Sequence, residues 1–432
     1  MENKTHYKQL KFESLKNMGF WDLYAYDKSV INAHFPVVKM NEVLKLRKDF
    51  FTIDDNENYK LCRVQLHGKG VVLRDTVKGK DIKTKKQQRC KPNDFLVAEI
   101  DAKVGGYGIV PDFLEDAIVS GHYFLFEINK EKLLPDFLSI LVKCDGFSKQ
   151  VKATGSTNYA AIRPYHVLDY KIPLPSIENQ IKIVAAYQHK IKLAEQQELK
   201  YLALEHEIEE YLSSELGIIS KKKSTPKKGL QFYSFKNTQR WDFWNESIEY
   251  HKQTYELIRL SSLISIQSGR FLPKSAQKKG SYIIYGGNGK TGEHSEFIYE
   301  GKRLLIGRVG EYCGNVHLIE GKYWITDNAF KVDKISEKVT YEYLELALTA
   351  LNLNNFKVLS AQPSISQGAV LALSIPVPST EIQNKIVKHI YELKIQVISL
   401  KQQSEQNRNL ALQDFENEIF KIQNHATKEA IH

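Results

Sequence analysis

The distribution of polar and apolar residues predicts two long helices, over residues 176–216 and 379–424. Neither stretch contains glycine or proline, the two residues least compatible with a helix interior. At 1.5 Å per residue, the shorter stretch is long enough for one helix of about 60 Å. Ser176 and Ser379 stand where an N-cap belongs, and an acidic residue follows in the first turn of each stretch. Both features favour a helix start.

Apolar residues in both stretches recur at alternating spacings of four and three, which is typical of a helix that packs along another helix. The second seam continues through Ser404, Asn407 and Ala411, and the first is interrupted by Glu198 and Glu205. We expect the two helices to form an antiparallel coiled-coil spacer. The alternative is that each is an amphipathic helix packed on its own domain. The seam residues are Tyr187, Ile191, Ala194, Tyr201, Ile208 and Leu212 in the first stretch, and Ile386, Ile390, Leu393, Val397 and Leu400 in the second.

The segments outside the helices have another pattern. Short apolar runs such as Phe95–Ile100 and Tyr123–Ile128 alternate with glycine-containing turns, as expected for strands. Residues 20–171 and 240–374 are therefore predicted to form two strand-rich α/β domains. The fold class expected for the whole chain is α+β, with the long helices separating the domains.

The chain contains an internal repeat. Ile172–Val184 reads IPLPSIENQIKIV and Ile375–Val387 reads IPVPSTEIQNKIV, so nine of thirteen positions are identical at an offset of 203 residues. A weaker echo links Trp21-Asp22 to Trp241-Asp242. Proline lacks an N–H and fixes φ, so each Ile-Pro-x-Pro must end a strand or extended segment before the helix. The repeat predicts a duplicated architecture with pseudo-two-fold symmetry.

The remaining segments complete the expected organisation. Ile219–Gly229 contains five lysines and one proline in eleven residues, which favours an exposed linker over the alternative of a phosphate-binding segment. The predicted order is an N-terminal extension (1–19), a first domain (20–171), a central helix segment (172–218), a basic linker (219–239), a second domain (240–374), a C-terminal helix segment (375–424) and a tail (425–432).

Composition narrows the choice of partners. The chain has 61 lysines and arginines against 51 acidic residues, a formal charge of +10, which favours a polyanion because bound phosphates release counterions. Net charge alone also fits a protein that is merely basic. The four cysteines are scattered and none lie at Cys-x-x-Cys spacing, which argues against zinc and fits a reducing cytoplasm. No apolar stretch approaches the ~18 residues of a membrane span, so we expect a cytoplasmic protein without a membrane partner.

Motifs for catalysis are missing. Gly289-Lys290-Thr291 resembles the end of a phosphate-binding loop, but Ile284 stands where that loop needs glycine, so a hairpin turn is predicted instead. No Pro-Pro pair occurs, which removes the Asn/Asp-Pro-Pro-aromatic site of an adenine methyltransferase. The 13 histidines are dispersed. We therefore predict no catalytic residue and no metal site in this chain.

The duplicated motifs resemble the specificity subunits of type I restriction-modification systems, which carry two target-recognition domains, each followed by a long helix. The resemblance covers residues 20–424, but the two domains differ strongly from each other, so it carries over no individual DNA contact. The segments that resemble the family's helix entries and domain cores are 172–180 and 375–383, Ile100–Lys103, Gly106–Val110 and Val119–Gly121 in the first domain, and Tyr285–Gly289, Gly307–Gly310 and Thr326–Asn328 in the second.

The resemblance implies a non-catalytic subunit that recognises an asymmetric bipartite target in double-stranded DNA, one half-site per domain. The helices would hold the half-sites about one turn apart, ~10 bp or ~34 Å. They would also dock two copies of a DNA adenine methyltransferase subunit, which would bind S-adenosylmethionine and flip adenines out of the duplex. A restriction or translocase subunit is a further expected partner. ATP and magnesium would be bound by partner subunits, and no cofactor is expected here.

Two basic segments are our candidates for DNA contact. Lys78–Lys91 has seven basic residues in fourteen; arginine and glutamine can read base edges, whereas lysines mainly bind phosphates. A solvated charged loop would have the same composition. The candidates are Lys78, Lys80, Lys83, Lys85, Lys86, Gln87, Gln88, Arg89 and Lys91 in the first domain, and Arg270, Lys274, Gln277, Lys278, Lys279, Asn288, Lys290 and Arg308 in the second.

Two other functions fit part of the pattern. The first is the specificity subunit of a two-subunit system that cuts on both sides of its site, and the neighbouring gene would distinguish it. The second is a coiled-coil scaffold with no DNA function, which would bind no duplex at any salt concentration.

Overall fold

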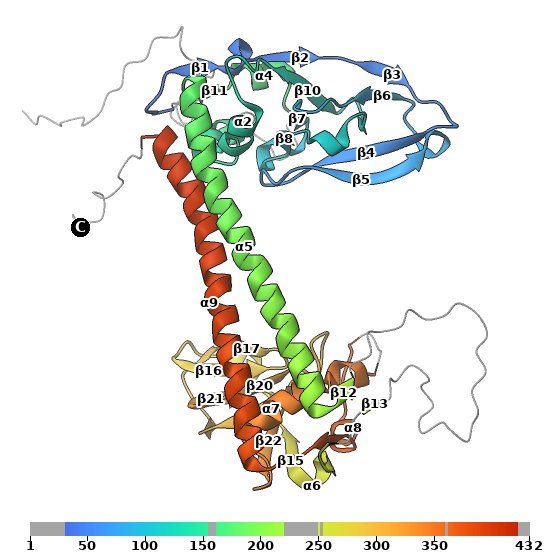
Figure 1. The fold of residues 1–432 in the computed structure, drawn as a ribbon, viewed down its shortest axis with the longest axis vertical. Helices are drawn as coiled ribbons and strands as arrows, with labels where there is room; N and C mark the ends of the chain where they lie inside the picture. Colours follow the sequence, from blue (N-terminus) through green and yellow to red (C-terminus); the bar gives the residue numbers. More distant parts are fainter. Residues whose placement is uncertain (1–30, 154–160, 220–248, 251–253, 359–361, 422–432) are drawn as a thin grey trace, which may run out of the picture. The chain divides into compact units, whose positions relative to one another are not determined.

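The computed structural model describes residues 31–153, 161–219, 249–250, 254–358 and 362–421 (Figure 1). The predicted N-terminal extension and C-terminal tail lie outside the described residues, as do nearly all of the predicted linker and the Trp21 and Trp241 echo. The chain divides into two compact units: unit 1 contains residues 1–196 and 403–432, and unit 2 contains residues 197–402.

Unit 1 is built on two main sheets. An antiparallel four-stranded sheet has the order β2-β10-β7-β8, and a five-stranded sheet has the order β3-β6-β9-β4-β5 with one parallel pair, β4 and β9. The strands are β2 (Leu44–Arg47), β3 (Phe50–Thr52), β4 (Asn58–Gln65), β5 (Gly70–Lys78), β6 (Lys86–Arg89), β7 (Phe95–Ala98), β8 (Tyr107–Ile109), β9 (Ile118–Val119) and β10 (Tyr123–Ile128).

Helices cover the four-stranded sheet of unit 1. Phe95 and Phe126 of the sheet are buried against Phe137 of α2 and Phe147 of α3 in one continuous apolar core. A separate strand pair, β1 with β11, leads into the first long helix. The elements are α2 (Pro135–Leu141), α3 (Asp145–Ala153), α4 (Pro164–Asp169), β1 (Val37–Lys39) and β11 (Lys171–Pro173).

Unit 2 also has two main sheets. The first is antiparallel with the order β15-β22-β19-β20, and the second has the order β17-β16-β21-β18, in which β16 and β21 are parallel. The strands are β15 (Ile264–Ser268), β16 (Tyr282–Gly286), β17 (Gly289–His294), β18 (Tyr299–Glu300), β19 (Arg303–Gly307), β20 (Val316–Ile319), β21 (Lys322–Ile325) and β22 (Ala329–Ile335).

Unit 2 packs its core against helices as unit 1 does. Tyr343 and Leu344 of α7 are fully buried with Leu304 and Ile306 of β19. Two short strand pairs complete the unit, β14 with β23 and β12 with β13. The elements are α6 (Leu260–Leu263), α7 (Tyr341–Ala350), α8 (Gln367–Leu371), β12 (Ile218–Ile219), β13 (Glu249–Tyr250), β14 (Leu257–Arg259) and β23 (Ser374–Pro376).

The predicted duplication is present in the topology. The sheets β2-β10-β7-β8 and β15-β22-β19-β20 have equivalent strand orders, and the pairs β1-β11 and β14-β23 each place the Ile-Pro segment beside the strand that directly precedes that sheet in the chain. The second sheets differ, with five strands in unit 1 and four in unit 2. The predicted α+β fold class is therefore confirmed, and the two halves have diverged mainly in one sheet.

Two helices of 40 residues each follow the Ile-Pro segments, α5 (Ile177–Leu216) and α9 (Thr380–Ile419). The C-terminal helix was predicted to run to Asn424, but α9 ends at Ile419. After it, Phe420 forms an isolated bridge with Ala33, and Lys421 donates its backbone N–H to Asn32. The C-terminal end therefore stops being helical because its backbone pairs with the start of the described chain.

The parts of α5 and α9 within unit 1 run antiparallel to each other. Ala194 is completely buried, and the buried Ser404 hydroxyl donates to its carbonyl oxygen at 2.9 Å. Farther along, Lys190 forms an ion pair with Asp414. Residue numbers thus rise along one helix as they fall along the other.

The helix segments within unit 2 are antiparallel as well. Leu393 and Val397 are buried, and Ile208 and Leu400 are half-buried. Glu205, which interrupts the apolar seam, forms an ion pair with Lys401 at 2.6 Å. The other predicted seam positions are buried at Leu212, Ile386 and Ile390, and half-buried at Tyr187 and Ile191 of unit 1 and Tyr201 of unit 2.

Candidate nucleic-acid interface

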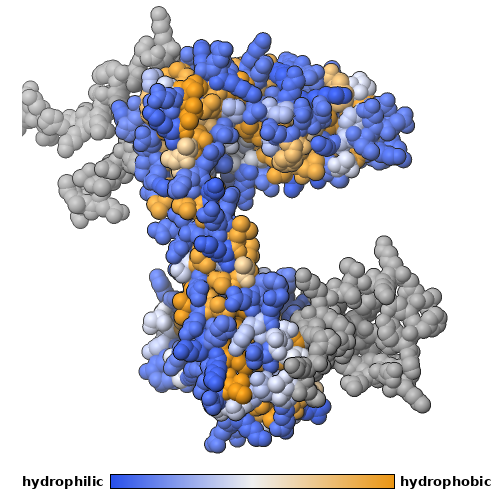
Figure 2. Space-filling model, viewed as in Figure 1, coloured by the Kyte–Doolittle hydropathy of each residue, from blue (hydrophilic) through white to orange (hydrophobic). Residues whose placement is uncertain are grey.

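The basic segment of unit 1, Lys78–Lys91, forms the end of β5, a 3-10 turn and β6. The strands around it lie together at one end of unit 1 (Figure 1), where the surface is mostly hydrophilic (Figure 2). Lys85 is half-buried because it forms an ion pair with Asp55 and donates to the carbonyl oxygen of Gly79 at 2.8 Å. The other basic residues are exposed: Lys78, Lys80, Lys83, Lys86, Arg89 and Lys91.

The structure corrects the prediction for Gln87 and Gln88. Gln88 is 2% exposed, and its side-chain amide donates to the carbonyl oxygens of Ser120 and Tyr123 at 3.3 and 2.9 Å. Gln87 is 5% exposed and donates to the carbonyl oxygen of Thr84 at 2.6 Å. Both amides donate to nearby backbone carbonyl groups, which leaves neither free to read a base edge.

The exposed cations of β6 lie over aromatic rings of the neighbouring strand β3. The guanidinium of Arg89 is 4.4 Å from the centroid of Phe51, and the ammonium of Lys86 is 5.1 Å from that of Phe50. Cation–π attraction holds these heads near the ring faces while leaving part of each in water. Arg89 also lies 3.9 Å from the carboxylate of Asp116. The arrangement presents positive charge and an apolar surface together.

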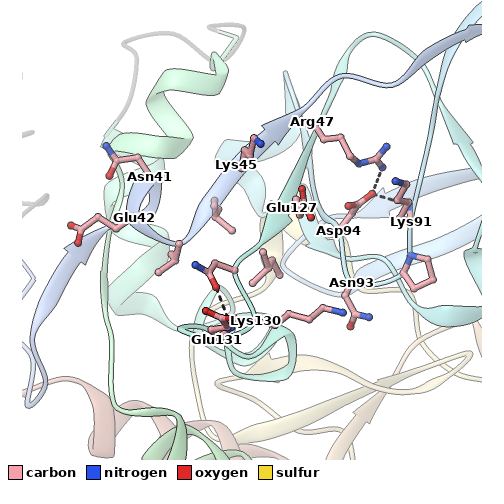
Figure 3. Close-up of a pocket in the computed structure, with 15 residues that line it drawn as sticks. Asn41, Glu42, Lys45, Arg47, Lys91, Asn93, Asp94, Glu127, Lys130 and Glu131 are labelled. Carbon is pink, nitrogen blue, oxygen red and sulfur yellow. Dashed lines mark hydrogen bonds and ion pairs between the residues drawn. The ribbon is translucent and has the colours of Figure 1, made fainter.

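A buried ion pair supports the end of β6. Arg47 forms an ion pair with Asp94 (Figure 3), and its guanidinium donates to the carbonyl oxygen of Arg89 at 2.7 Å. The backbone N–H of Lys91 donates to the same Asp94 carboxylate at 2.8 Å. Burial raises the pKa of Asp94, whereas Arg47 and Lys91 favour its charged form. The network fixes the backbone of both Arg89 and Lys91.

Beside this network lies a surface pocket of about 750 Å³ (Figure 3). Its charged lining residues are balanced, with four cations and four carboxylates, so the pocket does not favour a polyanion. These residues are Lys45, Arg47, Lys91, Lys130, Glu42, Asp94, Glu127 and Glu131.

The basic loop of unit 2, residues 269–280, connects β15 to β16 and is held at both ends. At the first end, Arg270 donates its backbone N–H to Ile325, and the indole N–H of Trp324 donates to the Arg270 carbonyl at 2.9 Å. At the second, the backbone N–H of Lys278 donates to Nδ1 of His294 at 3.0 Å. Its predicted DNA-contact residues are all exposed: Arg270, Lys274, Gln277, Lys278 and Lys279.

Two glycines permit the close approach of this loop to the sheet. A β-carbon at Gly269 would lie 2.3 Å from the carbonyl oxygen of Thr326, and one at Gly280 would lie 2.3 Å from that of His294. Both distances are far below van der Waals contact, so a side chain at either position would displace the loop. The basic loop is therefore preformed rather than loosely attached.

The three motifs singled out in the second domain come together at one point of unit 2. A β-carbon at Gly307 would lie 2.1 Å from the carbonyl oxygen of Gly287, so the Tyr-Gly-Gly-Asn-Gly turn packs directly on the end of β19. Arg308 is half-buried and donates to the carbonyl oxygen of Asp327 at 3.2 Å. The motifs thus pack together at one corner of the domain, and the hydrogen bond of Arg308 to Asp327 helps to stabilise this corner.

Two further predicted contacts lie on the adjoining hairpin. Asn288 is exposed and accepts a hydrogen bond from the side-chain amide of Asn315 at 2.9 Å. Lys290 is exposed and pairs with Glu293 at 2.9 Å. The predicted hairpin turn is present between β16 and β17. Both side chains remain accessible to a ligand.

The repeated glutamine of the Ile-Pro-x-Pro-Ser-x-x-x-Gln motif has a structural role that sequence reasoning did not assign. Gln180 is fully buried, accepts from the Leu134 N–H at 2.8 Å, and donates to the carbonyl oxygens of Lys132 and Pro175. Gln383 repeats the pattern with Thr340 at 3.0 Å, and with Lys338 and Pro378. The sequence signal for this structural role was that the same glutamine occurs in both copies of the repeat.

Within the described ranges, no group of three or more His, Cys, Asp or Glu residues is placed to hold a metal ion. Among those same residues, no helix is both long and apolar enough to cross a membrane.

The fold and the surface define a class of protein: two related strand-rich units, each exposing a basic segment supported by hydrogen bonds, as expected of a protein that contacts a polyanion at two places. The chain belongs to the family of the type I restriction modification DNA specificity domain, whose model matches residues 34–205 and 252–408. This family is the non-catalytic DNA-recognition component of type I systems. Each match contains one strand-rich domain and part of the long helix that follows it.

A relative that is itself a specificity subunit supports the assignment to this family. The type I restriction enzyme EcoprrI specificity subunit of Escherichia coli is 31% identical over 156 residues, which are 35% of this chain and 37% of that subunit. The matched region therefore spans little more than a third of that relative.

Two solved structures share the fold. A chain from a structure of complex assembly and conformational transition of the type I R-M system aligns with a TM-score of 0.57 at 16% identity, covering 90% of this chain and 98% of its own. The S subunit of the type I restriction-modification system of M. genitalium aligns with a TM-score of 0.51 at 14% identity, covering 91% of this chain and 97% of its own.

Proposed function

We propose that this chain is the sequence-specific DNA-recognition subunit of a type I restriction-modification complex, and that each unit contacts one half of a bipartite target. The observation that carries the proposal is the twofold match to the DNA specificity domain, once over each strand-rich domain. The exposed cations of both basic segments supply phosphate contacts, which position a protein on the duplex, while arginines supply base contacts.

The target is asymmetric because the two reading surfaces differ. In unit 1 the basic segment lies on β6 of a five-stranded sheet, whereas in unit 2 it lies on a loop between sheets. Different surfaces present different donors and acceptors to the base edges, so they select different sequences.

The long helices are proposed to act as the spacer between half-sites. A helix of 40 residues is about 60 Å long, which is enough to span one DNA turn of ~34 Å together with the attached domains. The base pairs between the half-sites are left unread. This gapped readout is the reason that a subunit without a catalytic site determines where its partners act.

The chemistry is assigned to partners. Two copies of a DNA adenine methyltransferase subunit would dock on the helices, bind S-adenosylmethionine and flip the target adenine. A restriction or translocase subunit would add ATP- and magnesium-dependent cleavage. The complex is proposed to act on DNA in the cytoplasm, and this chain contributes no cofactor site of its own.

Genome-wide mapping of N6-methyladenine tests the proposal. The chain is expressed with its neighbouring methyltransferase in a methylation-free host, and the methyltransferase alone is the control. The expected result is a gapped, asymmetric motif of methylated adenines that appears only when the chain is present. Equal methylation without the chain, or no methylation beside a demonstrably active partner, would contradict the proposal.

A further inference from the structure

Unit 2 exposes a large apolar side chain inside its basic loop. Phe271 is 68% exposed and lies between Arg270 and Lys274. Leaving a phenylalanine in water forgoes roughly 2 kcal/mol of burial, although single exposed apolar residues are common on protein surfaces. Its position on a loop that is hydrogen-bonded at both ends means that the ring is presented outward by a preformed support.

Unit 1 presents a phenylalanine at the equivalent place. Phe50 is the third residue after β2, and Phe271 is the third residue after β15. These two strands hold the same position in the equivalent sheets of the two units. Phe50 is 41% exposed, and the ammonium of Lys86 lies 5.1 Å from its ring centroid. An exposed phenylalanine beside cations therefore recurs at the same strand exit, although the surrounding sheets have diverged.

The surrounding charge favours nucleic acid over a protein partner. Residues 257–292 contain six basic residues and no acidic residue, so the segment that carries Phe271 attracts phosphates and offers no carboxylate to a basic protein surface. In unit 1, Asp49 precedes Phe50 but is paired with Arg47 at 3.1 Å. An aromatic ring flanked by phosphate-binding cations is suited to reach the apolar parts of bases.

We infer that Phe50 and Phe271 make the apolar base contacts of unit 1 and unit 2, one in each half-site, while the neighbouring cations bind phosphates. This inference rests on the proposed function. Each ring would either pack on a thymine methyl group in the major groove or enter between two base pairs as a wedge. In both cases the contact depends on base identity, so each phenylalanine determines specificity in its own half-site only.

The experiment compares Phe50→Ala and Phe271→Ala in the full chain, co-expressed with the neighbouring methyltransferase and analysed by N6-methyladenine mapping. Phe271→Ala is expected to relax one or two positions in one half of the motif, and Phe50→Ala in the other half. Phe113→Ala is the matched control, because Phe113 is 63% exposed but is surrounded by Asp112, Glu115 and Asp116. It is expected to leave the motif unchanged.

Affinity measurements on the purified complex separate base contacts from general binding. The probes are a 40-bp duplex carrying the mapped motif and two derivatives, each with one half scrambled. Each phenylalanine variant is expected to lower the ratio of target affinity to affinity for the duplex whose scrambled half is its own half-site, about 5- to 100-fold, without changing the salt dependence. Replacing single thymines by uracil, or neighbouring adenines by 2-aminopurine, identifies the methyl contact or the wedge. Phe271→Leu, which keeps an apolar side chain, is expected to retain part of the ratio.

The outcomes distinguish failure of the proposed function from failure of the inference about Phe50 and Phe271. If the wild-type chain directs no gapped methylation, the proposed function fails and the inference falls with it. If the wild-type chain does so, and both alanine variants keep its motif and its affinity ratio, only the inference is overturned. It is also overturned if both variants relax the same half, or if a variant loses as much affinity for the duplex whose scrambled half is its own half-site as it loses for the target.

Discussion

Individual residues of the internal repeat join each long helix to the domain before it. Gln180 and Gln383 are both fully buried, and each uses its amide to satisfy one N–H and two carbonyl groups of the backbone. A buried backbone group without a partner is costly. The repeated glutamine of the motif is thus explained by local hydrogen bonding, and it does not require a DNA contact.

Gln383→Leu is expected to lower the free energy of unfolding by about 2–4 kcal/mol, because it leaves three backbone groups of unit 2 unpaired. Urea denaturation followed by circular dichroism measures the effect. Gln196→Leu, an exposed position on α5, is the control and is expected to change stability by less than about 0.5 kcal/mol. Equal stability of the two variants would show that the buried amide contributes nothing.

Neighbouring residues of β6 are expected to differ in function. Arg89→Ala removes an exposed guanidinium and is expected to weaken or relax recognition of one half-site by about 1–3 kcal/mol with little change in melting temperature. Gln88→Ala removes a buried amide and is expected to lower the melting temperature while the methylated motif stays the same. Thermal unfolding and methylation mapping of both variants decide the matter. The reverse pattern would restore Gln88 as a base-reading residue.

At the scale of elements, the long helices have a periodic apolar seam and an ion pair at a position where a charged residue interrupts that seam. Ile390 is fully buried on α9, whereas Ile395 on the same helix is 67% exposed. Glu205 interrupts the apolar seam of α5, but its half-buried side chain forms an ion pair with Lys401 of α9. An ion pair therefore links the two helices at this interruption of the apolar seam.

Ile390→Ala is expected to destabilise unit 2 by about 2–4 kcal/mol, because it removes buried methylene groups and leaves a cavity. Ile395→Ala tests the same chemical change at an exposed position and should cost little. Differential scanning calorimetry of both variants measures the difference. Similar costs would mean that Ile395 is also buried in solution, for example beneath another subunit.

At the scale of the whole molecule, the duplication preserved one sheet and one helix entry per half, while the basic surfaces diverged. The four-stranded sheets keep the same strand order, and the Ile-Pro strands keep the same pairing. The basic residues lie on non-equivalent segments, on β6 in unit 1 and on the loop before β16 in unit 2. The two halves thus keep a common fold and differ in the segments that carry their basic residues.

Removing the lysines of the unit 1 turn is expected to weaken binding to every duplex alike. In the triple variant Lys78→Ala, Lys80→Ala and Lys83→Ala, the slope of log K against log salt should become less steep by about 0.9 for each phosphate that is no longer neutralised. Fluorescence anisotropy with target and scrambled duplexes measures it. Lys182→Ala, which removes an exposed lysine paired with Glu178 on α5, should leave the slope unchanged. An unchanged slope in the triple variant would place this segment away from DNA.

The predictions that succeeded depended on features spread over many residues. The two long helices, the α+β class and the duplication follow from spacing and repetition, which local physics imposes on any packed helix or strand. The predictions that failed concerned individual side chains and the C-terminal end of the second long helix. Gln87 and Gln88 looked like base readers beside so many cations, and only the tertiary structure shows that both are buried, although adjacent side chains of a strand lie on opposite faces of the sheet.

The sequence alone determined the family of this protein, its duplicated plan and the location of its basic segments, because these depend on order and composition along the chain. Tertiary structure decided which side chains of those segments are exposed and unpaired, and which are buried or hydrogen-bonded. The side chains of Gln87, Gln88 and Lys85 donate hydrogen bonds to backbone carbonyl groups. Phe50 and Phe271, which follow the ends of β2 and β15, remain exposed. Whether a side chain meets water or a backbone carbonyl depends on how the backbone around it folds and on strands from elsewhere in the chain, such as the segment of Ser120 and Tyr123 beside Gln88, which no local pattern encodes.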